Sequence, residues 1–421
     1  MTNKHTILAL LGIPLFIVAF AVATFYALHH SFPTFDLLCH WDCGWYTDVK
    51  NNGYVFIAGE QCNVAFFPLL PYLWKWSGLS VFGISTLNFL VFTGSAVLLV
   101  RHFSINHKTL ITFLSIGLVG FFLIPYTESL FFIGSSLMLI GLNKKNYLVL
   151  TLGIFIAIIT RSASMIFIVA LVVSLGVEWF CTPKNKQYFI ILYAVVLVVL
   201  TTLVVLCFQY LQTGEFLGFF KTHAEWGHHL QLPQLPLSGW HWPVPLTDSF
   251  ALIIGVSCML ILIGYVGSHF SFVPKKWASC VFHINGTLAL QEVFTLLYLS
   301  GGSLFILLYQ GGNLSSINRY VLSTPFYLVL LHLLQTRKII FNVSPKVFII
   351  ILLVLNFIMP HAYPEHLFFV FISNIILAFG VFYALQSTEK KWVRFFQIAC
   401  IIGIILQSVL FTNYLKGMWM G

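Results

Sequence analysis

The chain has 421 residues, of which 59% are hydrophobic and only 8% are charged, and its net charge is +9. No water-soluble domain needs so much apolar surface, so the composition excludes a soluble protein and indicates an integral membrane protein. The basic residues are divided among separate short loops, and we therefore expect membrane lipids and no nucleic acid as partners.

Continuous apolar runs, without short alternating segments, predict membrane-spanning helices and not a barrel. Residues 7–28 are long enough to span and are followed by no small-residue cleavage site, so we expect a retained first span. The fold class that follows is an all-α polytopic membrane protein with about thirteen helices. The expected spans are 7–28, 79–100, 109–124, 129–142, 147–160, 163–180, 189–208, 249–267, 287–309, 320–334, 347–359, 367–385 and 395–412.

Lysine and arginine are distributed very unequally between the two sides of the membrane when the N-terminus is placed in the cytoplasm. Six of these residues then lie outside, namely Lys50, Lys75, Arg161, Lys221, Arg319 and Lys416. The other 15 lie inside, namely Lys4, Arg101, Lys108, Lys144, Lys145, Lys184, Lys186, Lys275, Lys276, Arg337, Lys338, Lys346, Lys390, Lys391 and Arg394. The outer face is the periplasm if the protein lies in a bacterial inner membrane, which its small size and short loops favour. The alternative is the lumen of the endoplasmic reticulum.

Acidic residues gather in the first of two long outer segments, which cover residues 29–78 and 209–248. Asp36, Asp42 and Asp48 lie close together, although Asp and Glu total only 12 in the chain. A carboxylate at a membrane surface among aromatic residues is a candidate general base, and Asp42 is that candidate. The alternative for Asp42 is a capping or salt-bridged loop carboxylate. Asp36 and Asp48 suit structural more than catalytic roles, and Asp48 is kept as a substrate-binding candidate.

The same segment shows helical spacing of apolar residues. This spacing predicts an amphipathic helix lying flat on the membrane, with Asp42 and Tyr46 on neighbouring faces and Gly53 at its end. Pro68 and Pro71 are expected to prevent a regular helix after it. The apolar positions are Leu38, Trp41, Trp45 and Val49.

The third to fifth expected spans are only about 14–16 residues long, which gives roughly 21–24 Å against a hydrocarbon core of about 30 Å. Their outer turns hold Glu128 and Arg161, and charges at such depth face a wet cavity or each other. Arg319, at the outer start of a later span, has the same character. Two arginines at a cavity floor suit an anionic phosphate. A buried structural Glu–Arg pair is the alternative.

These motifs, taken in order, resemble those of the PIG-V-like mannosyltransferases, the family of GPI mannosyltransferase II, which has many bacterial members. The resemblance covers about three quarters of the chain. It rests on Trp41-Asp42, Tyr46, Gly53-Tyr54, Ala65-Phe66-Phe67-Pro68-Leu69, Pro71, Tyr126-Thr127-Glu128-Ser129-Leu130, Thr160-Arg161-Ser162, Trp226-Gly227, Arg319-Tyr320 and Pro325.

The resemblance implies the GT-C class of multispanning glycosyltransferases, with a polyprenyl-phosphate-linked sugar as donor and a lipid or glycan as acceptor. It implies a conserved module at 1–186 and a variable transmembrane module at 187–421. It makes the acidic residue Asp42 the general base of an inverting displacement. The expected sugar is mannose, and no metal or other cofactor is expected. The substrate-binding candidates are Tyr46, Asp48, Glu128, Arg161, His223, Trp226, Arg319 and Tyr320. His40, His223 and His228 depart from the family pattern of arginine, glutamine and arginine, which puts the substrate identity in question.

Cysteine and histidine leave further alternatives. The three outer cysteines predict a Cys43–Cys62 or a Cys39–Cys62 disulfide. Cys39, His40 and Cys43 also imitate part of a zinc site, although the spacing matches no four-ligand pattern. Four more histidines lie in the second outer segment, namely His223, His228, His229 and His241. We expect them to be surface residues of an interfacial aromatic belt, and binding of a divalent ion is the alternative.

Two other functions remain open. A lipid-linked glycan polymerase or ligase predicts paired arginines late in a large outer loop, and the 209–248 segment holds only Lys221. A lipid-linked sugar transporter or flippase predicts internal repeats and helices interrupted at mid-membrane, and the sequence shows no convincing repeat.

Overall fold

The structure is a computed structural model of the chain. It describes residues 4–162, 164–181, 187–239, 241–269, 282–283, 286–337, 340–341, 350, 352–353, 366–387 and 389–421. The expected span 347–359 falls almost wholly outside these residues. So do six of the basic residues expected inside, namely Lys184, Lys186, Lys275, Lys276, Lys338 and Lys346.

The protein is all-α, with sixteen α-helices within the described ranges. Six of them are long and apolar enough to cross a membrane, which indicates a multi-pass integral membrane protein and confirms the class expected from composition. These six are α1 (Lys4–His29), α4 (Val81–Phe103), α9 (Tyr188–Thr213), α11 (Pro245–Gly267), α13 (Leu290–Tyr309) and α18 (Lys390–Leu415).

The remaining helices are shorter. They are α2 (Asp42–Asn52), α3 (Leu69–Ser77), α5 (His107–Ile116), α6 (Glu128–Lys144), α7 (Tyr147–Thr160), α8 (Ser164–Cys181), α10 (Gly218–Glu225), α14 (Ile317–Val321), α15 (Pro325–Thr336) and α17 (Leu367–Phe379). Short 3-10 turns occupy Phe35–Leu38, Asn63–Ala65 and Val119–Leu123, and a π-helical turn covers Gly380–Ala384. Two-residue strands β1 (Phe282–His283) and β2 (Ile340–Phe341) pair antiparallel.

The expected span 109–124 is wrong as a single helix. The chain leaves α5 at Gly117, whose backbone is extended, and then forms a 3-10 turn. A Cβ at Gly117 would lie 2.9 Å from the carbonyl oxygen of Leu322, so the close approach of another segment requires glycine there. Gln407 accepts a hydrogen bond from the Val119 amide at 2.7 Å and satisfies the interrupted backbone.

Helices α6 and α7 pack so closely that their backbones are in contact. This packing fixes two charged residues at one end of the molecule. A Cβ at Gly141 would lie 2.6 Å from the Leu150 amide nitrogen, and one at Gly134 would lie 2.6 Å from that of Ala157. The two helices run antiparallel. Glu128 at the start of α6 therefore lies beside Arg161, which directly follows α7.

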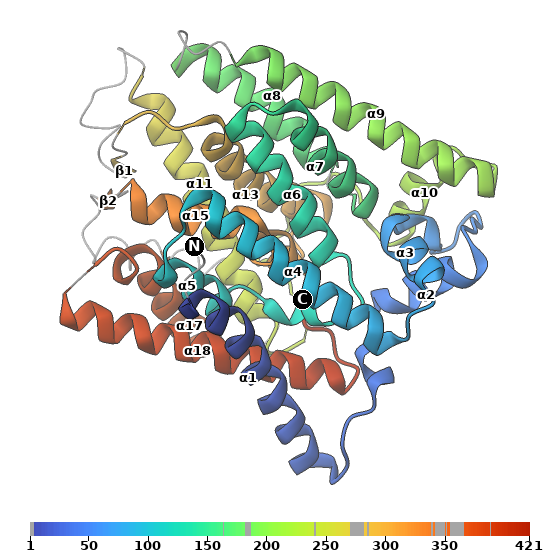
Figure 1. The fold of residues 1–421 in the computed structure, drawn as a ribbon, viewed down its shortest axis with the longest axis horizontal. Helices are drawn as coiled ribbons and strands as arrows, with labels where there is room; N and C mark the ends of the chain where they lie inside the picture. Colours follow the sequence, from blue (N-terminus) through green and yellow to red (C-terminus); the bar gives the residue numbers. More distant parts are fainter. Residues whose placement is uncertain are drawn as a thin grey trace.

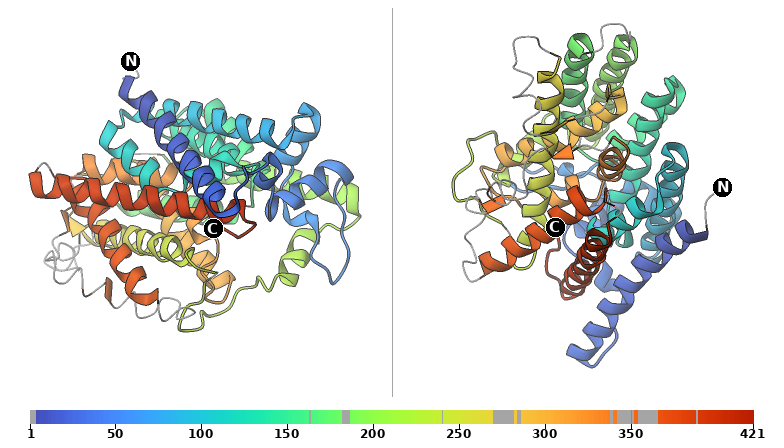
Figure 2. Two further views of the ribbon diagram at one scale, coloured as in Figure 1. Left: turned by 90° about the horizontal axis from the view of Figure 1, so that it is seen from below. Right: turned by 90° about the vertical axis from the view of Figure 1, so that its left-hand side faces the viewer.

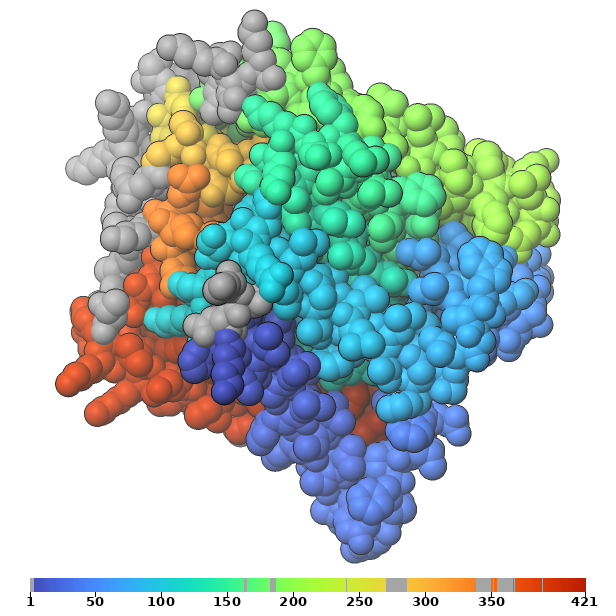
Figure 3. Space-filling view, in the orientation of Figure 1, coloured from blue at the N-terminus to red at the C-terminus, as the bar shows by residue number. Residues whose placement is uncertain are grey.

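The helices of the two long segments that were expected outside, 29–78 and 209–248, gather at one end of the molecule. Figure 1 shows α2, α3 and α10 together at the right, away from β1 and β2 at the left. The left-hand view of Figure 2 shows the same grouping, and in Figure 3 the blue and yellow-green surfaces of these segments lie against each other. Gln209 near the end of α9 donates to the carbonyl of Val64 at 2.8 Å and ties the first segment to that helix.

The first outer segment folds partly as expected. Its helix α2 ends at Gly53 (φ 78°), as predicted, but begins only at Asp42, so Leu38 and Trp41 lie outside it. The expectation that prolines prevent a second helix is wrong, because α3 starts at Leu69 with Pro68 as its N-cap and Pro71 in its first turn. Amides of the first turn have no partner within the helix, so proline costs nothing there.

Candidate functional site

A cavity of about 720 Å³ is lined in part by residues of both segments, 29–78 and 209–248. Its walls come from the first outer segment, the ends of α6 and α7, α10 and the turn after it, the loop before α14, and the residues after α18. The lining residues include Asp42, Trp45, Tyr46, Phe66, Arg161, His223, Trp226, His228, Arg319, Tyr320 and Trp419.

Asp42 is the first residue of α2, and a strained turn places it there. The preceding Trp41 has φ 55° and ψ −119°, the conformation of the first central residue of a type II′ turn. Glycine adopts this conformation freely, whereas a large side chain pays of order 1–3 kcal/mol. The surrounding contacts therefore hold Trp41 in place, and they direct the chain so that Asp42 opens the helix at the cavity wall.

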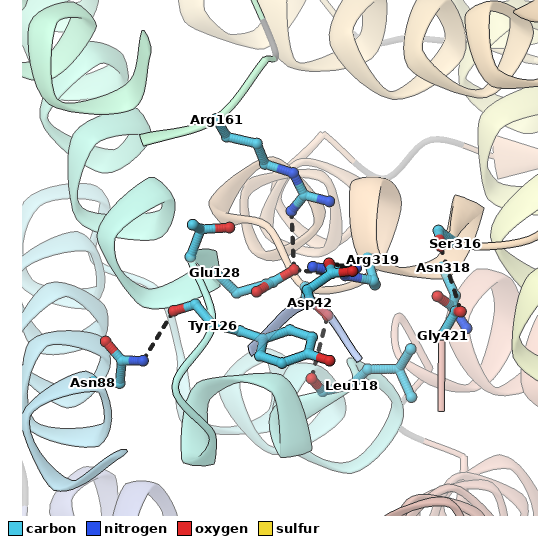
Figure 4. Close-up of polar contacts among 12 residues, drawn as sticks. Asp42, Asn88, Leu118, Tyr126, Glu128, Arg161, Ser316, Asn318, Arg319 and Gly421 are labelled. Carbon is cyan, nitrogen blue, oxygen red and sulfur yellow. Dashed lines mark hydrogen bonds and ion pairs between the residues drawn. The ribbon is translucent and has the colours of Figure 1, made fainter. Parts of the chain in front are cut away.

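Four charged side chains form one connected chain at this wall (Figure 4). The Asp42 carboxylate accepts a hydrogen bond from Nη1 of Arg319 at 2.8 Å. Arg319 donates from Nε to Oε1 of Glu128 at 2.7 Å, and Nη1 of Arg161 donates to the same oxygen at 3.0 Å. The other carboxylate oxygen of Glu128, Oε2, is buried and has no hydrogen-bond partner among the described residues.

The four members differ in their access to the cavity. The Glu128 side chain is fully buried, whereas that of Asp42 is 25% exposed. Charges this far from water are stable only when they are paired, and two acids with two bases give such a balance. Glu128 is therefore the internal counterion of both arginines, and Asp42 is the acid that faces the cavity.

Aromatic rings lie against both guanidinium groups, one at Arg161 and three at Arg319. The guanidinium carbon of Arg161 lies 3.9 Å from the ring centre of Tyr320. That of Arg319 lies 5.0 Å from the ring centres of Phe121, Tyr126 and Trp419. Cation–π attraction at these distances strengthens when water is excluded.

Buried amide and carboxyl groups hold the turns that carry the charges. Asn88 on α4 donates to the carbonyls of Ile124 and Tyr126, at 2.7 and 2.9 Å, just before Glu128. Asp248 on α11 accepts from the Asn318 amide at 3.3 Å, directly before Arg319. Both contacts fix backbone just before a charged residue of the connected chain.

A second wall of the cavity is aromatic. The rings of Trp45 and Phe66 are nearly parallel, with centres 5.8 Å apart. The Trp226 ring stands perpendicular to both, at 5.9 and 6.0 Å. Tyr46 is buried beside them, and its hydroxyl lies 3.4 Å from that of Thr127. Such ring faces suit the C–H faces of a sugar ring or a prenyl chain.

Two histidines face each other beside this wall. Nδ1 of His223 lies 3.3 Å from Nδ1 of His228, and Nε2 of His223 is buried with no hydrogen-bond partner in the part of the chain that the structure describes. Burial, and secondarily the neighbouring His228, lower the pKa of His223 to about 4. Burial also lowers the pKa of His228. Both rings are therefore neutral at pH 7, so they can form hydrogen bonds but carry no positive charge.

The structure brings most of the predicted site residues together. Asp42, Tyr46, Arg161, His223, Trp226, Arg319 and Tyr320 all line the cavity. Glu128 lies directly behind the wall and touches it through both arginines.

Asp48 is the predicted substrate-binding residue that does not join them. Its carboxylate accepts from the side-chain amides of Asn52 and Asn63, at 2.7 and 2.6 Å. Asn63 also accepts from the amide of Val55 and donates to the carbonyl of Gly53, so it joins the end of α2 to the following loop. In this position Asp48 ties the loop together outside the cavity.

Both disulfides expected from the sequence are wrong. Cys39 is bonded to Cys43, while Cys62 is buried and free. The sharp turn at Trp41 brings the two Cα atoms to 5.1 Å, within the usual range for a disulfide. Sγ of Cys62 instead accepts from the Ile57 amide at 3.1 Å. The disulfide also occupies both thiols of the zinc-like arrangement considered around His40.

Sequence reasoning missed several residues that line or support the cavity. Gln310, Asn313, Ser315 and Ser316 form a polar lip, and their clustering directly before Arg319 was an available signal. Asn88 and Asp248 were also overlooked, although polar residues within or beside apolar runs are functional candidates by default. Trp419 carried no sequence signal.

Over the described ranges, no group of three or more histidine, cysteine, aspartate and glutamate side chains is placed to hold a metal ion. Comparisons with family models, curated proteins and solved structures gave no match to this chain. The fold and the site thus define a multi-pass membrane protein with a charge-paired, aromatic-walled cavity at one end.

Proposed function

We propose that the protein is an inverting glycosyltransferase that moves a sugar, most simply mannose, from a polyprenyl phosphate to a lipid or glycan acceptor. One observation carries this proposal. Asp42, a partly exposed carboxylate, lies with two buried arginines in the lining of a cavity that stacked aromatic rings also line. A base, an anion-stabilising pair and a sugar-binding surface are the parts that such a transfer requires.

The proposed reaction is a single displacement. The acceptor hydroxyl oxygen attacks the anomeric carbon while its proton passes to the Asp42 carboxylate. The bond between the anomeric carbon and the phosphate oxygen breaks, and the polyprenyl phosphate leaves from the opposite face with the electron pair. The configuration at the anomeric carbon therefore inverts.

The arginines stabilise the charge that grows on the leaving phosphate. Arg161 and Arg319 lie within the cavity wall, and Glu128 fixes both at one oxygen. Because Glu128 is fully buried behind them, it orients the guanidinium groups and does not contact the sugar. Tyr46, Trp45 and Trp226 offer ring surfaces for the sugar, and neutral His223 offers a hydrogen bond to a hydroxyl.

The membrane placement is part of the same proposal. We place the cavity on the outer face, which is the periplasm of a bacterial inner membrane, with the N-terminus in the cytoplasm. The shorter helices α5, α6, α7, α8, α15 and α17 then join the six long ones as spans. Together with the expected span 347–359, which falls almost wholly outside the described residues, they make a GT-C-type fold of about thirteen spans. Arg161 and Arg319, both counted outside by charge asymmetry, lie at the cavity end, which fits this orientation.

The direct test is transfer of a labelled sugar in detergent. The purified protein is incubated with polyprenyl monophosphate carrying labelled mannose or glucose and with a lipid extract as acceptor. We expect a labelled glycolipid whose anomeric configuration is opposite to that of the donor. Movement of the intact donor across liposomes without transfer would support a flippase, and extension of a glycan by repeated units would support a polymerase.

A further inference from the structure

The residues after α18 return to the cavity and meet the turn that presents Asp42. The carbonyl of Gly417 accepts a hydrogen bond from the Trp41 indole at 3.0 Å. The ring of Trp419 lies 5.8 Å from that of Trp41, edge on. Trp419 is only 7% exposed and lines the cavity. The tail, residues 416–421, therefore supports the strained Trp41 backbone described above.

The same tail contacts the central arginine. Trp419 is one of the three rings whose centres lie 5.0 Å from the Arg319 guanidinium carbon, with Phe121 and Tyr126. The Ser316 hydroxyl, at the start of α14, donates to the carbonyl of Gly421 at 3.4 Å (Figure 4). Ion pairs orient the polar edge of the guanidinium, and the rings restrict it from other directions.

We infer that Trp419 is a positioning residue that holds Arg319 and the Trp41 turn so that Arg319 and Asp42 meet at the cavity. Residues far apart in sequence supply the two charges, and the tail contacts the elements that carry both. The catalytic consequence rests on the proposed function, whereas the positioning itself is a property of the folded protein.

The first experiment measures positioning without catalysis. Arginine side chains are modified with phenylglyoxal in detergent, and the rate at each arginine is followed by peptide mass spectrometry. The variants are Trp419→Ala, Trp419→Leu and Trp419→Phe, with Trp76→Ala as the matched control, since Trp76 is 79% exposed.

We expect Arg319 to react about tenfold faster in the Ala and Leu variants, in line with the loss of one desolvated cation–π contact. In the Phe variant and in the Trp76 control, Arg319 should react at the same rate as in the unaltered protein. Arg161, which is covered by Tyr320, should stay protected throughout. Unchanged Arg319 reactivity in Trp419→Ala overturns the inference, and so does an equal rise at Arg161, which would report general loosening.

The second experiment measures transfer with the same variants. We expect kcat to fall in the Ala and Leu variants with little change in the acceptor KM, and to recover in the Phe variant. Full kcat in Trp419→Leu would overturn the role of the aromatic face, because leucine keeps much of the volume. If the unaltered protein transfers no sugar, the proposed function fails, while Arg319 reactivity still decides the positioning.

Discussion

Asp42 and Arg319 are 277 positions apart in the chain and form an ion pair of 2.8 Å at the cavity wall. Asp42 opens α2 in the first outer segment, and Arg319 lies in the short helix α14 near the polar lip. Neither group is free, because each holds the other in place. The acid that we propose as base is therefore oriented before substrate arrives.

Replacing Asp42 with asparagine should remove transfer while leaving the fold intact. Asparagine is nearly isosteric and its carbonyl still accepts a hydrogen bond from Arg319, but it takes up no proton. Loss of a general base lowers the rate by about 10²–10⁴-fold. The measurement is sugar transfer together with the thermal unfolding midpoint. Asp36→Asn, an exposed change in the same segment, is the control and should keep full activity. Normal transfer by the Asp42 variant would remove this residue from the mechanism.

Replacing Glu128 with glutamine should destabilise the protein. Two buried arginines then lose their shared counterion, and an uncompensated buried charge costs about 3–5 kcal/mol. Thermal unfolding in detergent measures this, with Glu389→Gln as control because the Glu389 side chain is 64% exposed. The double variant Glu128→Gln, Arg161→Gln removes one excess charge and should regain part of the loss. An unchanged midpoint in the single variant would contradict a counterion role.

Trp226 should contribute to sugar binding through its ring face. Removing the ring in Trp226→Ala is expected to raise the KM of a sugar substrate about tenfold, which is a loss of about 1.4 kcal/mol. Trp226→Phe keeps an aromatic face, so its KM values should be close to those of the unaltered protein. The measurement is KM for donor and acceptor separately. If alanine leaves both KM values unchanged, the aromatic wall does not bind substrate in the rate-limiting complex.

Stability should depend on pH through His223. Its pKa is about 4 in the folded protein, because of burial and the neighbouring His228, against an ordinary value near 6.5. The unfolded chain thus binds the proton more readily, so this contribution is complete above pH 6.5 and declines as the pH falls towards 4. The loss in the free energy of unfolding at low pH is about 1–3 kcal/mol, because the ring is partly exposed and solvent screens the effect.

This pH dependence is measured as the unfolding midpoint from about pH 7.5 to about pH 4.5, that is, from about one unit above to about two units below the ordinary histidine pKa. His223→Asn carries no titratable ring, so its midpoint should vary less over the same interval. His229→Asn, an exposed change next to the pair, should keep the original slope. Identical slopes in all three proteins would show that His223 is not buried as a neutral ring.

The disulfide is checked by mass spectrometry of unreduced protein. We expect Cys39 and Cys43 within one peptide that lacks two hydrogens, and Cys62 as a thiol that reacts with an alkylating reagent only after unfolding. Buried thiols react slowly, since the reagent needs an accessible thiolate. A peptide that links Cys62 to either of the other two would contradict the observed pairing.

The membrane class and the principal charged residues were predictable from sequence for a simple reason. Glu128, Arg161 and Arg319 stand at the ends of apolar runs where an isolated charge is costly, so each is a functional candidate taken alone. Asp42 was identified because acids are otherwise scarce. Their assembly into one chain depends on the tertiary packing of α2, α6, α7 and α14, which residue spacing does not encode.

The errors arose where local geometry overrides pattern. The turn at Trp41 adopts a conformation that a tryptophan rarely takes, and it decides both the start of α2 and the partner of Cys43. The substrate-binding role of Asp48 stays a prediction, although Asn63 holds its carboxylate in the loop and Asp48 does not line the cavity. Helix α3 formed despite two prolines because both lie at its beginning. None of these outcomes follows from periodicity.

The shared position of Arg319 between two acids has a consequence for timing. When Asp42 accepts a proton in the proposed reaction, its bond to Arg319 loses the attraction between opposite charges. In the same step the departing phosphate gains negative charge. Arg319 is then drawn from a partner that has just been neutralised to one that has just become more anionic, so proton uptake and departure of the lipid carrier assist each other.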